Sequence, residues 1–419
     1  MNLRYWRILS VCLCLIGWGL AAIVGVTQPV SIALPQAESS PKAQASEPAM
    51  NAKLIAANTR LSFKLFSAIL QQQPDQNIFI SPASVAIALS MTYNGAKGET
   101  QEAIAQTLEL QGMSLEDINQ GYAALRATFT HLDPKVQLSV ANSLWARKGE
   151  PFIPEFLQRN QDFYGAKITD LDFHDPSTPS IINTWVKQST HGKIETIIDG
   201  KEIEPDTILF LINAIYFKGL WTTPFDKTKT QELPFTLLNG TQKAHPIMFQ
   251  QAQYGYYANN LFQAVTLPYG QERLSLYIFL PQKNVSLQTF YKNLNAENWE
   301  QWMNQFEAKQ VLVGLPRFKL DYGLELNDTL KSLGMAIAFD VNQADFTGMT
   351  PRSAYISRVK HNTFFEVNEE GSEAAGATSV QMGTRAAPPQ LIADRPFFCV
   401  IRDNQTKTIL FMGSIVKPQ

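Results

Sequence analysis

Apolar residues recur at helical spacing through the first half of the chain. One apolar helix face consists of Leu61, Phe63, Phe66, Ile69 and Leu70. The pair Ser81-Pro82 is typical of a helix start, because serine caps the first turn and proline fits it. The pair Asn94-Gly95 is typical of a helix end. Further helices are predicted at residues 99–108, 114–132, 154–164 and 177–190.

Strand patterns lie between these helices and predominate in the second half of the chain. The alternation from Val136 to Leu144 predicts a half-buried strand, and the apolar run 207–221 predicts a strand in the centre of a sheet. Asn239-Gly240 predicts a hairpin turn. Other strands are predicted at residues 274–280, 311–320, 363–367, 396–402 and 408–415. Helices and strands mix without regular βαβ spacing, which favours the α+β class.

Composition indicates an ordinary globular chain of 419 residues, with 45% hydrophobic and 17% charged positions. The formal net charge of -2 gives no basic field that would attract nucleic acid, so no nucleic-acid partner is expected. Residues 28–50 are rich in Pro, Ala, Ser, Gln and Glu and are predicted to be a flexible linker. No second linker and no repeat follows, so residues 51–419 are predicted to be one domain.

The N-terminal segment 1–27 is predicted to direct export. Arg4 and Arg7 precede an uncharged stretch that is apolar through Val26. A cleaved signal peptide and a retained membrane anchor are both compatible with this length. The protein is therefore expected to be extracellular or periplasmic, and membrane-tethered if the segment is retained.

Three cysteines are present, and two of them, Cys12 and Cys14, lie within the export segment. If that segment is removed, Cys399 remains alone and no intrachain disulfide can form. Cys399 stands in an apolar strand pattern, which favours a buried inert thiol over a nucleophile.

A search for catalytic motifs finds none. The chain has no G-x-S-x-G, H-E-x-x-H, P-loop or G-x-G-x-x-G pattern. None of the five histidines lies at metal-ligand spacing from another histidine or a cysteine. No metal, no cofactor and no enzymatic activity are therefore expected. A hydrolase whose Ser-His-Asp triad is scattered through the fold is the alternative.

Small residues dominate the segment that follows the strand pattern 363–367. One interpretation is a flexible linker, although a loop as long as 369–394 without structure is uncommon unless it is functional or disordered. The other interpretation is a segment that becomes a strand. One face would then consist of Ser372, Ala374, Gly376, Thr378 and Val380, which are all small or β-branched. Glu373 would lie on the opposite face and meet water. The segment is therefore able to enter a sheet without burying a charge.

The stretch 368–378, N-E-E-G-S-E-A-A-G-A-T, resembles the hinge of inhibitory serpins, a family of serine protease inhibitors. The resemblance extends over residues 54–418. Further family motifs follow in order at residues 77–84, 182–186, 190–194, 211–221, 224–225, 315–318, 344–349 and 411–413. The resemblance implies the serpin fold, with three β-sheets, eight to nine helices and an exposed reactive-centre loop. In this family the cut loop inserts into the large sheet and traps the acylated protease.

The resemblance also implies where the loop is cut. Counting from Glu369 places the scissile bond between Arg385 and Ala386. Arg385 is the only basic residue between Lys360 and Arg395. An arginine suits a protease whose specificity pocket holds a carboxylate, so the expected partner is a trypsin-like serine protease in a covalent complex. The alternative is that Arg385 only keeps a loop soluble.

Three groups of residues take mechanical roles by resemblance. The hinge consists of Glu369, Glu370, Gly371, Ser372, Glu373, Ala374, Ala375, Gly376, Ala377 and Thr378. The shutter, a polar cluster beneath the sheet where strands part, consists of Ser81, Ser84, Asn213 and His361. The breach, where the loop begins to enter, consists of Trp221, Arg317 and Glu369, with an expected charge pair between the last two.

Two further expectations concern partners. Heparin-activated serpins carry a basic face on the helix that matches residues 114–132, whereas this segment has Arg126 beside Glu116 and Asp117. No heparin-type activation is expected, and the protein is expected to be a monomer. The alternative function is a non-inhibitory serpin that acts as a binding or carrier module. The small, uncharged face of the hinge favours inhibition.

Overall fold

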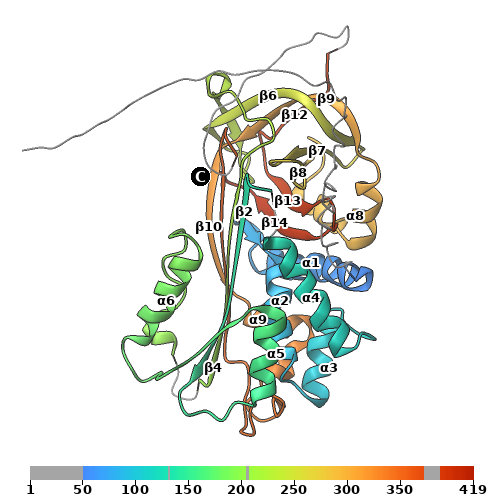
Figure 1. Ribbon diagram of the computed structural model, residues 1–419. Coiled ribbons are helices and arrows are strands. Elements are labelled where there is room, and N and C mark those ends of the chain that lie inside the picture. Colours follow the sequence, from blue (N-terminus) through green and yellow to red (C-terminus); the bar gives the residue numbers. More distant parts are fainter. Residues whose placement is uncertain (1–50, 131–132, 204–206, 372–386) are drawn as a thin grey trace, which may run out of the picture. The chain divides into compact units, whose positions relative to one another are not determined.

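Two β-sheets run across each other in the computed structural model, which describes residues 51–130, 133–203, 207–371 and 387–419 (Figure 1). Within these ranges the strand order of the five-stranded sheet is β10-β11-β4-β2-β3. The nine-stranded sheet has the order β1-β14-β13-β8-β7-β6-β9-β12, with β5 paired to β6. All described residues belong to one compact unit. The predicted segments 1–27 and 28–50 lie outside the described residues and remain predictions.

The helices have the following bounds: α1 (Ala52–Gln72), α2 (Pro82–Tyr93), α3 (Gly98–Thr107), α4 (Leu115–Thr130), α5 (Pro154–Tyr164), α6 (Thr178–Ser189), α7 (Leu287–Lys292), α8 (Ala296–Met303) and α9 (Asn327–Leu330). The strands are β1 (Ile78–Ile80), β2 (Val136–Arg147), β3 (Lys167–Leu171), β4 (Leu209–Gly219), β5 (Gln231–Thr236), β6 (Gln242–Ala258), β7 (Phe262–Pro268), β8 (Leu274–Pro281), β9 (Glu307–Pro316), β10 (Phe318–Glu325), β11 (Val359–Val367), β12 (Gln390–Ile392), β13 (Phe397–Asp403) and β14 (Ile409–Ile415). The α+β class is confirmed.

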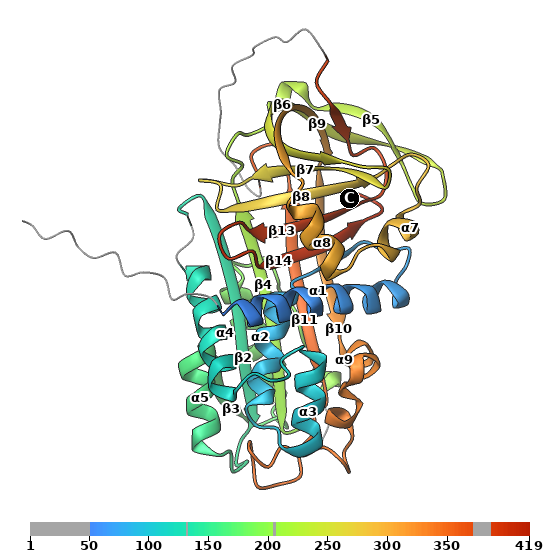
Figure 2. The same cartoon turned by 90° about the vertical axis from the view of Figure 1, so that its right-hand side faces the viewer.

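The three expected sheets are joined into two hydrogen-bonded networks in the described part of the chain, because β6 is shared. This strand pairs with β5 at one end, with β9 along its middle and with β7 at its other end. In Figure 2 the long strands β2, β4, β10 and β11 run vertically, and the strands β7, β8, β13 and β14 run crosswise in the upper part of the view.

The start of α2 forms as its sequence predicts. The Ser81 side chain accepts a hydrogen bond from the Ser84 N–H, and Pro82 occupies the first turn, where its missing N–H costs nothing. All residues of α2 are buried, because this helix contacts both β4 of one sheet and β14 of the other. The helix therefore places Ser81 and Ser84 beneath the five-stranded sheet.

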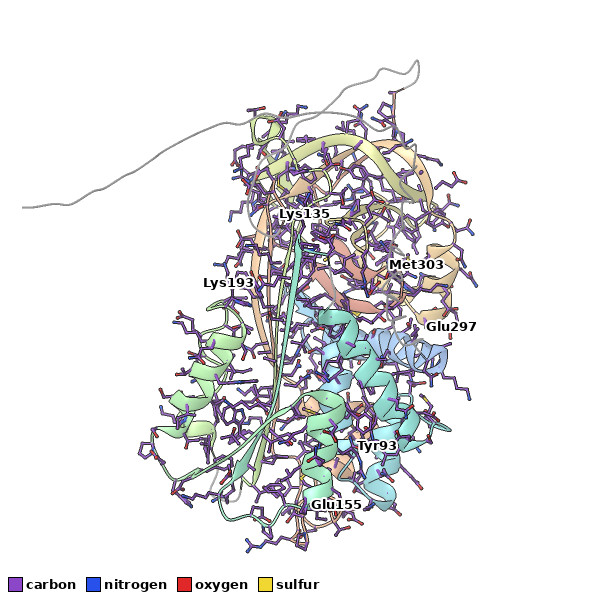
Figure 3. The ribbon with its side chains drawn as sticks, in the orientation of Figure 1. Tyr93, Lys135, Glu155, Lys193, Glu297 and Met303 are labelled. Atoms are coloured by element: carbon purple, nitrogen blue, oxygen red, sulfur yellow. The ribbon has the colours of Figure 1, made fainter. Side chains whose placement is uncertain are left out.

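The prediction of a half-buried strand for β2 holds only for its first half. From Ala141 to Ala146 every residue is buried, so both faces of the strand are covered. The cause is α6 on the face opposite to α2, because its Ile182 and Val186 share a buried core with Trp145 of β2 (Figure 1). On that same face Lys193, which follows α6 and is labelled in Figure 3, lies over the ring of Phe364.

The prediction of one strand at residues 311–320 is wrong. The chain forms two strands there, β9 in the nine-stranded sheet and β10 in the five-stranded sheet. Pro316 has no N–H to continue a ladder, and the Arg317 N–H donates to the Pro246 carbonyl at 3.0 Å. Arg317 therefore lies where the chain passes from one sheet to the other.

No helix within the described ranges combines the length and the apolar character that crossing a membrane requires.

The packing of α6 predicts a pair of unequal stability effects. Ile182 is fully buried, whereas its neighbour Ile181 is 43% exposed on the same helix. Ile182→Ala should lower the free energy of unfolding by about 2–5 kcal/mol, because it leaves a cavity under α6. Ile181→Ala should change it by less than about 0.5 kcal/mol. Urea denaturation of both variants is the measurement, and equal midpoints would contradict this account of the second core.

Candidate functional site

The pairing of β4 with β11 stops before either strand ends. The two strands run parallel, in register from Val359 opposite Leu211 to Phe364 opposite Tyr216. Among the described residues, the last three of each strand, 365–367 and 217–219, have no pairing with each other. The two strands part at this end, which is where the chain leaves β11 for the predicted loop.

A tight turn at residues 368–371 reverses the chain at this opening. The Asn368 N–H donates to the Gly371 carbonyl at 3.0 Å, and the Gly371 N–H donates to the Asn368 carbonyl at 3.3 Å. Gly371 forms an antiparallel bridge with Leu220, just past the end of β4. Its φ is 124°, and a Cβ there would lie 2.1 Å from the Gly219 carbonyl oxygen. Only glycine fits, and at Gly371 the chain runs antiparallel to the residue that follows β4.

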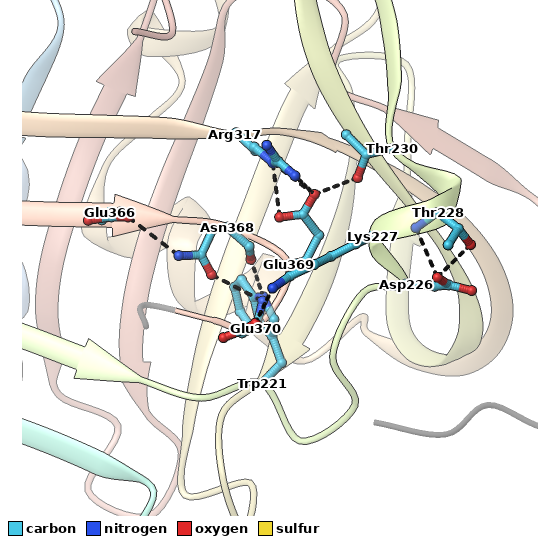
Figure 4. Close-up of polar contacts among 10 residues, drawn as sticks. All are labelled: Trp221, Asp226, Lys227, Thr228, Thr230, Arg317, Glu366, Asn368, Glu369 and Glu370. Carbon is cyan, nitrogen blue, oxygen red and sulfur yellow. Dashed lines mark hydrogen bonds and ion pairs between the residues drawn. The ribbon is translucent and has the colours of Figure 1, made fainter. Parts of the chain in front are cut away.

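The breach residues surround this turn (Figure 4). Arg317 Nε donates to both carboxylate oxygens of Glu369, at 2.8 and 2.9 Å, and Arg317 also contacts Glu369 through Nη2. The expected charge pair is therefore present. Trp221 Nε1 donates to the Asn368 carbonyl at 2.9 Å, and the Trp221 ring stacks on Tyr269 at 4.4 Å.

Glu369 stays ionised in this environment. Its side chain is 3% exposed, so burial works against the charged form. The hydrogen bonds from Arg317 and from the Thr230 hydroxyl outweigh burial and hold the pKa of Glu369 below its ordinary value. The pair therefore resists separation at neutral pH.

The shutter residues form one hydrogen-bonded cluster that crosses from β11 to β4. His361 of β11 lies opposite Asn213 of β4, and its Nδ1 is 2.8 Å from Asn213 Oδ1. The Asn213 amide donates to Ser84 Oγ and to Asn142 Oδ1. The Ser81 N–H donates to His361 Nε2 at 3.0 Å. Ser81 Oγ donates instead to the Leu410 carbonyl, so His361 and Ser81 do not form a base–nucleophile pair.

The hydrogen bonds of His361 define its state. Nε2 accepts from a backbone N–H, so the proton lies on Nδ1, which donates to Asn213 Oδ1. The ring is fully buried, and burial lowers the pKa of His361 to about 3. The histidine is therefore neutral, and it connects the two strands that the loop would separate.

A family model described as "Serpin (serine protease inhibitor)" matches residues 56–418. The chain belongs to the serpin family. Leukocyte elastase inhibitor from Homo sapiens is 35% identical over 379 residues, which cover 87% of this chain and 100% of that protein.

Two solved structures are similar to this serpin. Native tengpin, a thermophilic serpin, has a TM-score of 0.81 and 32% identity, and the match covers 89% of this chain and 96% of tengpin. Human thyroxine-binding globulin complexed with thyroxine has a TM-score of 0.81 and 27% identity, with 88% and 99% covered. One fold thus includes proteins named as protease inhibitors and a protein named for ligand binding, so it does not decide between these functions.

The structure of this serpin brings together the described part of each predicted group. Glu369, Glu370 and Gly371 of the hinge form the turn beside the breach. The remaining hinge residues, 372–378, and the predicted scissile bond between Arg385 and Ala386 lie outside the described residues. The roles of hinge, shutter, breach and scissile bond therefore remain predictions.

The other end of the predicted loop is anchored. The chain re-enters the described part at Ala387, and the Leu312 N–H donates to the Pro389 carbonyl at 3.0 Å. β12 then pairs parallel with β9.

Cys399 is buried in β13 as predicted, and burial raises the pKa of its thiol. Within the described ranges, no group of three or more His, Cys, Asp or Glu side chains is placed to hold a metal ion.

Sequence reasoning missed three residues of these clusters. Asn142 of β2 accepts from Asn213, Thr230 donates to Glu369, and Lys227 contacts Glu370. Asn142 had a detectable signal, since an amide within a strand needs a partner. Lys227 and Thr230 had none, because they follow the predicted strand in an ordinary polar stretch.

The buried neutral His361 predicts a loss of stability in acid. An unfolded histidine has a pKa near 6.5, so below that pH the unfolded chain binds a proton that the folded protein does not take up until about pH 3. The contribution of neutral His361 to the free energy of unfolding is fully present above about pH 6.5. It declines as pH falls, by up to about 1.4 kcal/mol per pH unit.

His361→Gln removes this titration, so comparison with the wild type separates it from other groups. Between pH 7 and pH 5, the wild type should lose about 2 kcal/mol more unfolding free energy than the variant. Chemical denaturation at the two pH values gives both losses. Equal losses would show that His361 is not the group responsible.

Proposed function

We propose that this serpin inhibits serine proteases of trypsin-like specificity as a suicide substrate. The protease cuts between Arg385 and Ala386, and the cut loop enters the five-stranded sheet between β4 and β11. The turn at residues 368–371 supports this most directly, because it reverses the chain where β4 and β11 part and bridges Gly371 antiparallel to Leu220, just past β4. In this proposal the protein is consumed and is not an enzyme.

The energy for trapping the protease comes from strand addition. β4 and β11 are parallel to each other, so a strand that turns back after β11 and lies between them would be antiparallel to both. Each added hydrogen bond contributes about 0.5–1.5 kcal/mol net. A strand of about a dozen residues then rivals the total stability of an ordinary domain, about 5–15 kcal/mol. The human elastase inhibitor, similar over 87% of this chain, supports inhibition as the outcome.

The proposal includes a monomeric inhibitor without heparin-type activation. On α4, Arg126 is half-buried, and it packs so closely on Gly165 at the end of α5 that a Cβ there would lie 2.6 Å from Nη1. Glu116 and Asp117 occupy the first turn of α4. This helix therefore offers little to a polyanion.

We also propose export, extracellular or periplasmic, directed by residues 1–27. Its support is the pair Arg4 and Arg7 before an apolar stretch. Sequencing the mature N-terminus distinguishes a removed signal peptide from a retained anchor.

Trypsin tests the function directly. The wild type should form an SDS-resistant complex with trypsin, whereas a carrier of the thyroxine-binding kind would be cleaved without one. Arg385→Ala should reduce the inhibition rate at least a hundredfold, since it leaves the carboxylate of the protease pocket unpaired, at a cost of several kcal/mol. Unchanged unfolding of the variant is the control. A variant that inhibits trypsin as fast as the wild type would mean that the scissile bond is misplaced.

The hinge provides a second test, because insertion must be faster than hydrolysis of the acyl-enzyme. Ala374→Pro removes a ladder N–H from the segment that enters the sheet, and Ser372→Arg adds a charge that must be desolvated. Both variants should still be cut at Arg385 but become substrates, with several-fold more inhibitor consumed per trypsin inactivated. Glu373→Ala, on the water-facing side, is the matched control and should change little. Wild-type stoichiometry in all three would refute the hinge assignment.

A further inference from the structure

The segment 221–230 supplies hydrogen-bond donors to the hinge turn, residues 368–371. It donates five hydrogen bonds to three consecutive residues, Asn368, Glu369 and Glu370. Three of the donor residues, Trp221, Lys227 and Thr230, are drawn in Figure 4. The donors are Trp221 Nε1, Trp221 N, Phe225 N, Lys227 Nζ and Thr230 Oγ1. Three of these bonds go to backbone carbonyls and fix the path of the turn, and two go to the carboxylates.

Each of the two carboxylates has its own cation. Arg317, between β9 and β10, contacts Glu369, and Lys227 contacts Glu370. The Glu370 side chain is 11% exposed, whereas that of Lys227 is 64% exposed, so the lysine reaches from the surface to a nearly buried carboxylate. Glu370 Oε2 is buried and has no hydrogen-bond partner among the described residues. In that part of the chain, Lys227 is the only cation paired with Glu370.

Lys227 is directed toward the turn by its own short helix. The 3-10 helix Lys227–Lys229 is capped by Asp226, whose Oδ1 accepts from the Thr228 N–H at 3.0 Å and from the Thr228 hydroxyl at 2.7 Å. Lys229, on the same turn, is paired with Asp226 at 3.9 Å. The two lysines thus share one helix, but only Lys227 contacts the hinge.

We infer that Lys227 is a positioning residue for loop insertion. By neutralising Glu370 it holds the 368–371 turn closed against Leu220, so that insertion starts from a turn already formed at the opening of β4 and β11. Without Lys227 the nearly buried Glu370 carboxylate is unpaired, and its most favourable response is to move to water and open the turn. Insertion must then order these residues first. This inference rests on the proposed function and specifies how it starts.

The test variant is Lys227→Gln in the full-length protein, assayed against trypsin. Cleavage at Arg385 should keep its rate, because the cut bond is unchanged, while insertion slows by about tenfold, the effect of losing a hydrogen bond to a charged group. The inhibitor consumed per trypsin inactivated should rise several-fold, with cut inhibitor replacing complex on SDS gels. Lys227→Arg, which keeps the charge, should restore the wild-type ratio. Lys229→Gln is the matched control and should behave as the wild type.

A double-mutant cycle separates the charge effect from loss of packing. Glu370→Gln removes the charge that Lys227 neutralises, so in that background Lys227→Gln should have no further effect on the ratio. This comparison also applies if the single Lys227→Gln variant folds poorly, because the double variant buries no unpaired charge. A merely structural role for Lys227 would change the ratio equally in both backgrounds.

The outcomes distinguish this inference from the proposed function. If the wild type is cut by trypsin without forming a complex, the proposed function fails and this inference with it. If the wild type inhibits and Lys227→Gln keeps the same ratio, or Lys227→Arg does not restore it, only the role of Lys227 is refuted.

Discussion

His361 and Asn213, which are 148 positions apart in the chain, hold together the two parallel strands β11 and β4. On their outer sides β4 and β11 each have an antiparallel neighbour, β2 and β10. Parallel pairing is slightly less stable per residue than antiparallel pairing, so the ladder between β4 and β11 is the weakest in the centre of this sheet. The buried hydrogen bonds of His361 compensate for that weakness, and they must break or rearrange if another strand enters.

At the end of this ladder where β11 leads into the turn 368–371, the structure is held by ion pairs. Glu369 and Glu370 are adjacent, nearly buried carboxylates, and each is paired with a cation from a different element. Arg317 reaches Glu369 because the chain changes sheets at Pro316. The break between β9 and β10 therefore places Arg317 where it can pair with Glu369. This ion pair connects the end of β11 to the junction of the two sheets.

Local signals in the sequence were sufficient for much of the fold. The cap at Ser81, the hairpin at Asn239-Gly240 and the apolar run of β4 each depend on neighbouring residues, and each formed as predicted. The break at Pro316 was missed because the apolar pattern continues across it. The covering of β2 was missed because α6 follows it in the chain and adds a second core from the other side.

The candidate site likewise has parts that the sequence predicts and parts that it does not. The alternation of small residues predicts its hinge, which remains a prediction, and the expected pair between Arg317 and Glu369 is present. The contact of Lys227 with Glu370 joins residues 143 positions apart, and no local pattern in a single sequence indicates such a distant partner.

The placement of β12, β13 and β14 determines what a cut in the loop can release. β13 lies between β8 and β14, β14 lies between β13 and β1, and every residue of β14 is buried. The part of the chain that follows the cut is therefore held in the nine-stranded sheet, because its strands β13 and β14 have paired strands on both sides. Cleavage between Gly371 and Ala387 would produce two polypeptides that remain one particle. Separating them requires unfolding the core, so neither piece would diffuse away after such a cut.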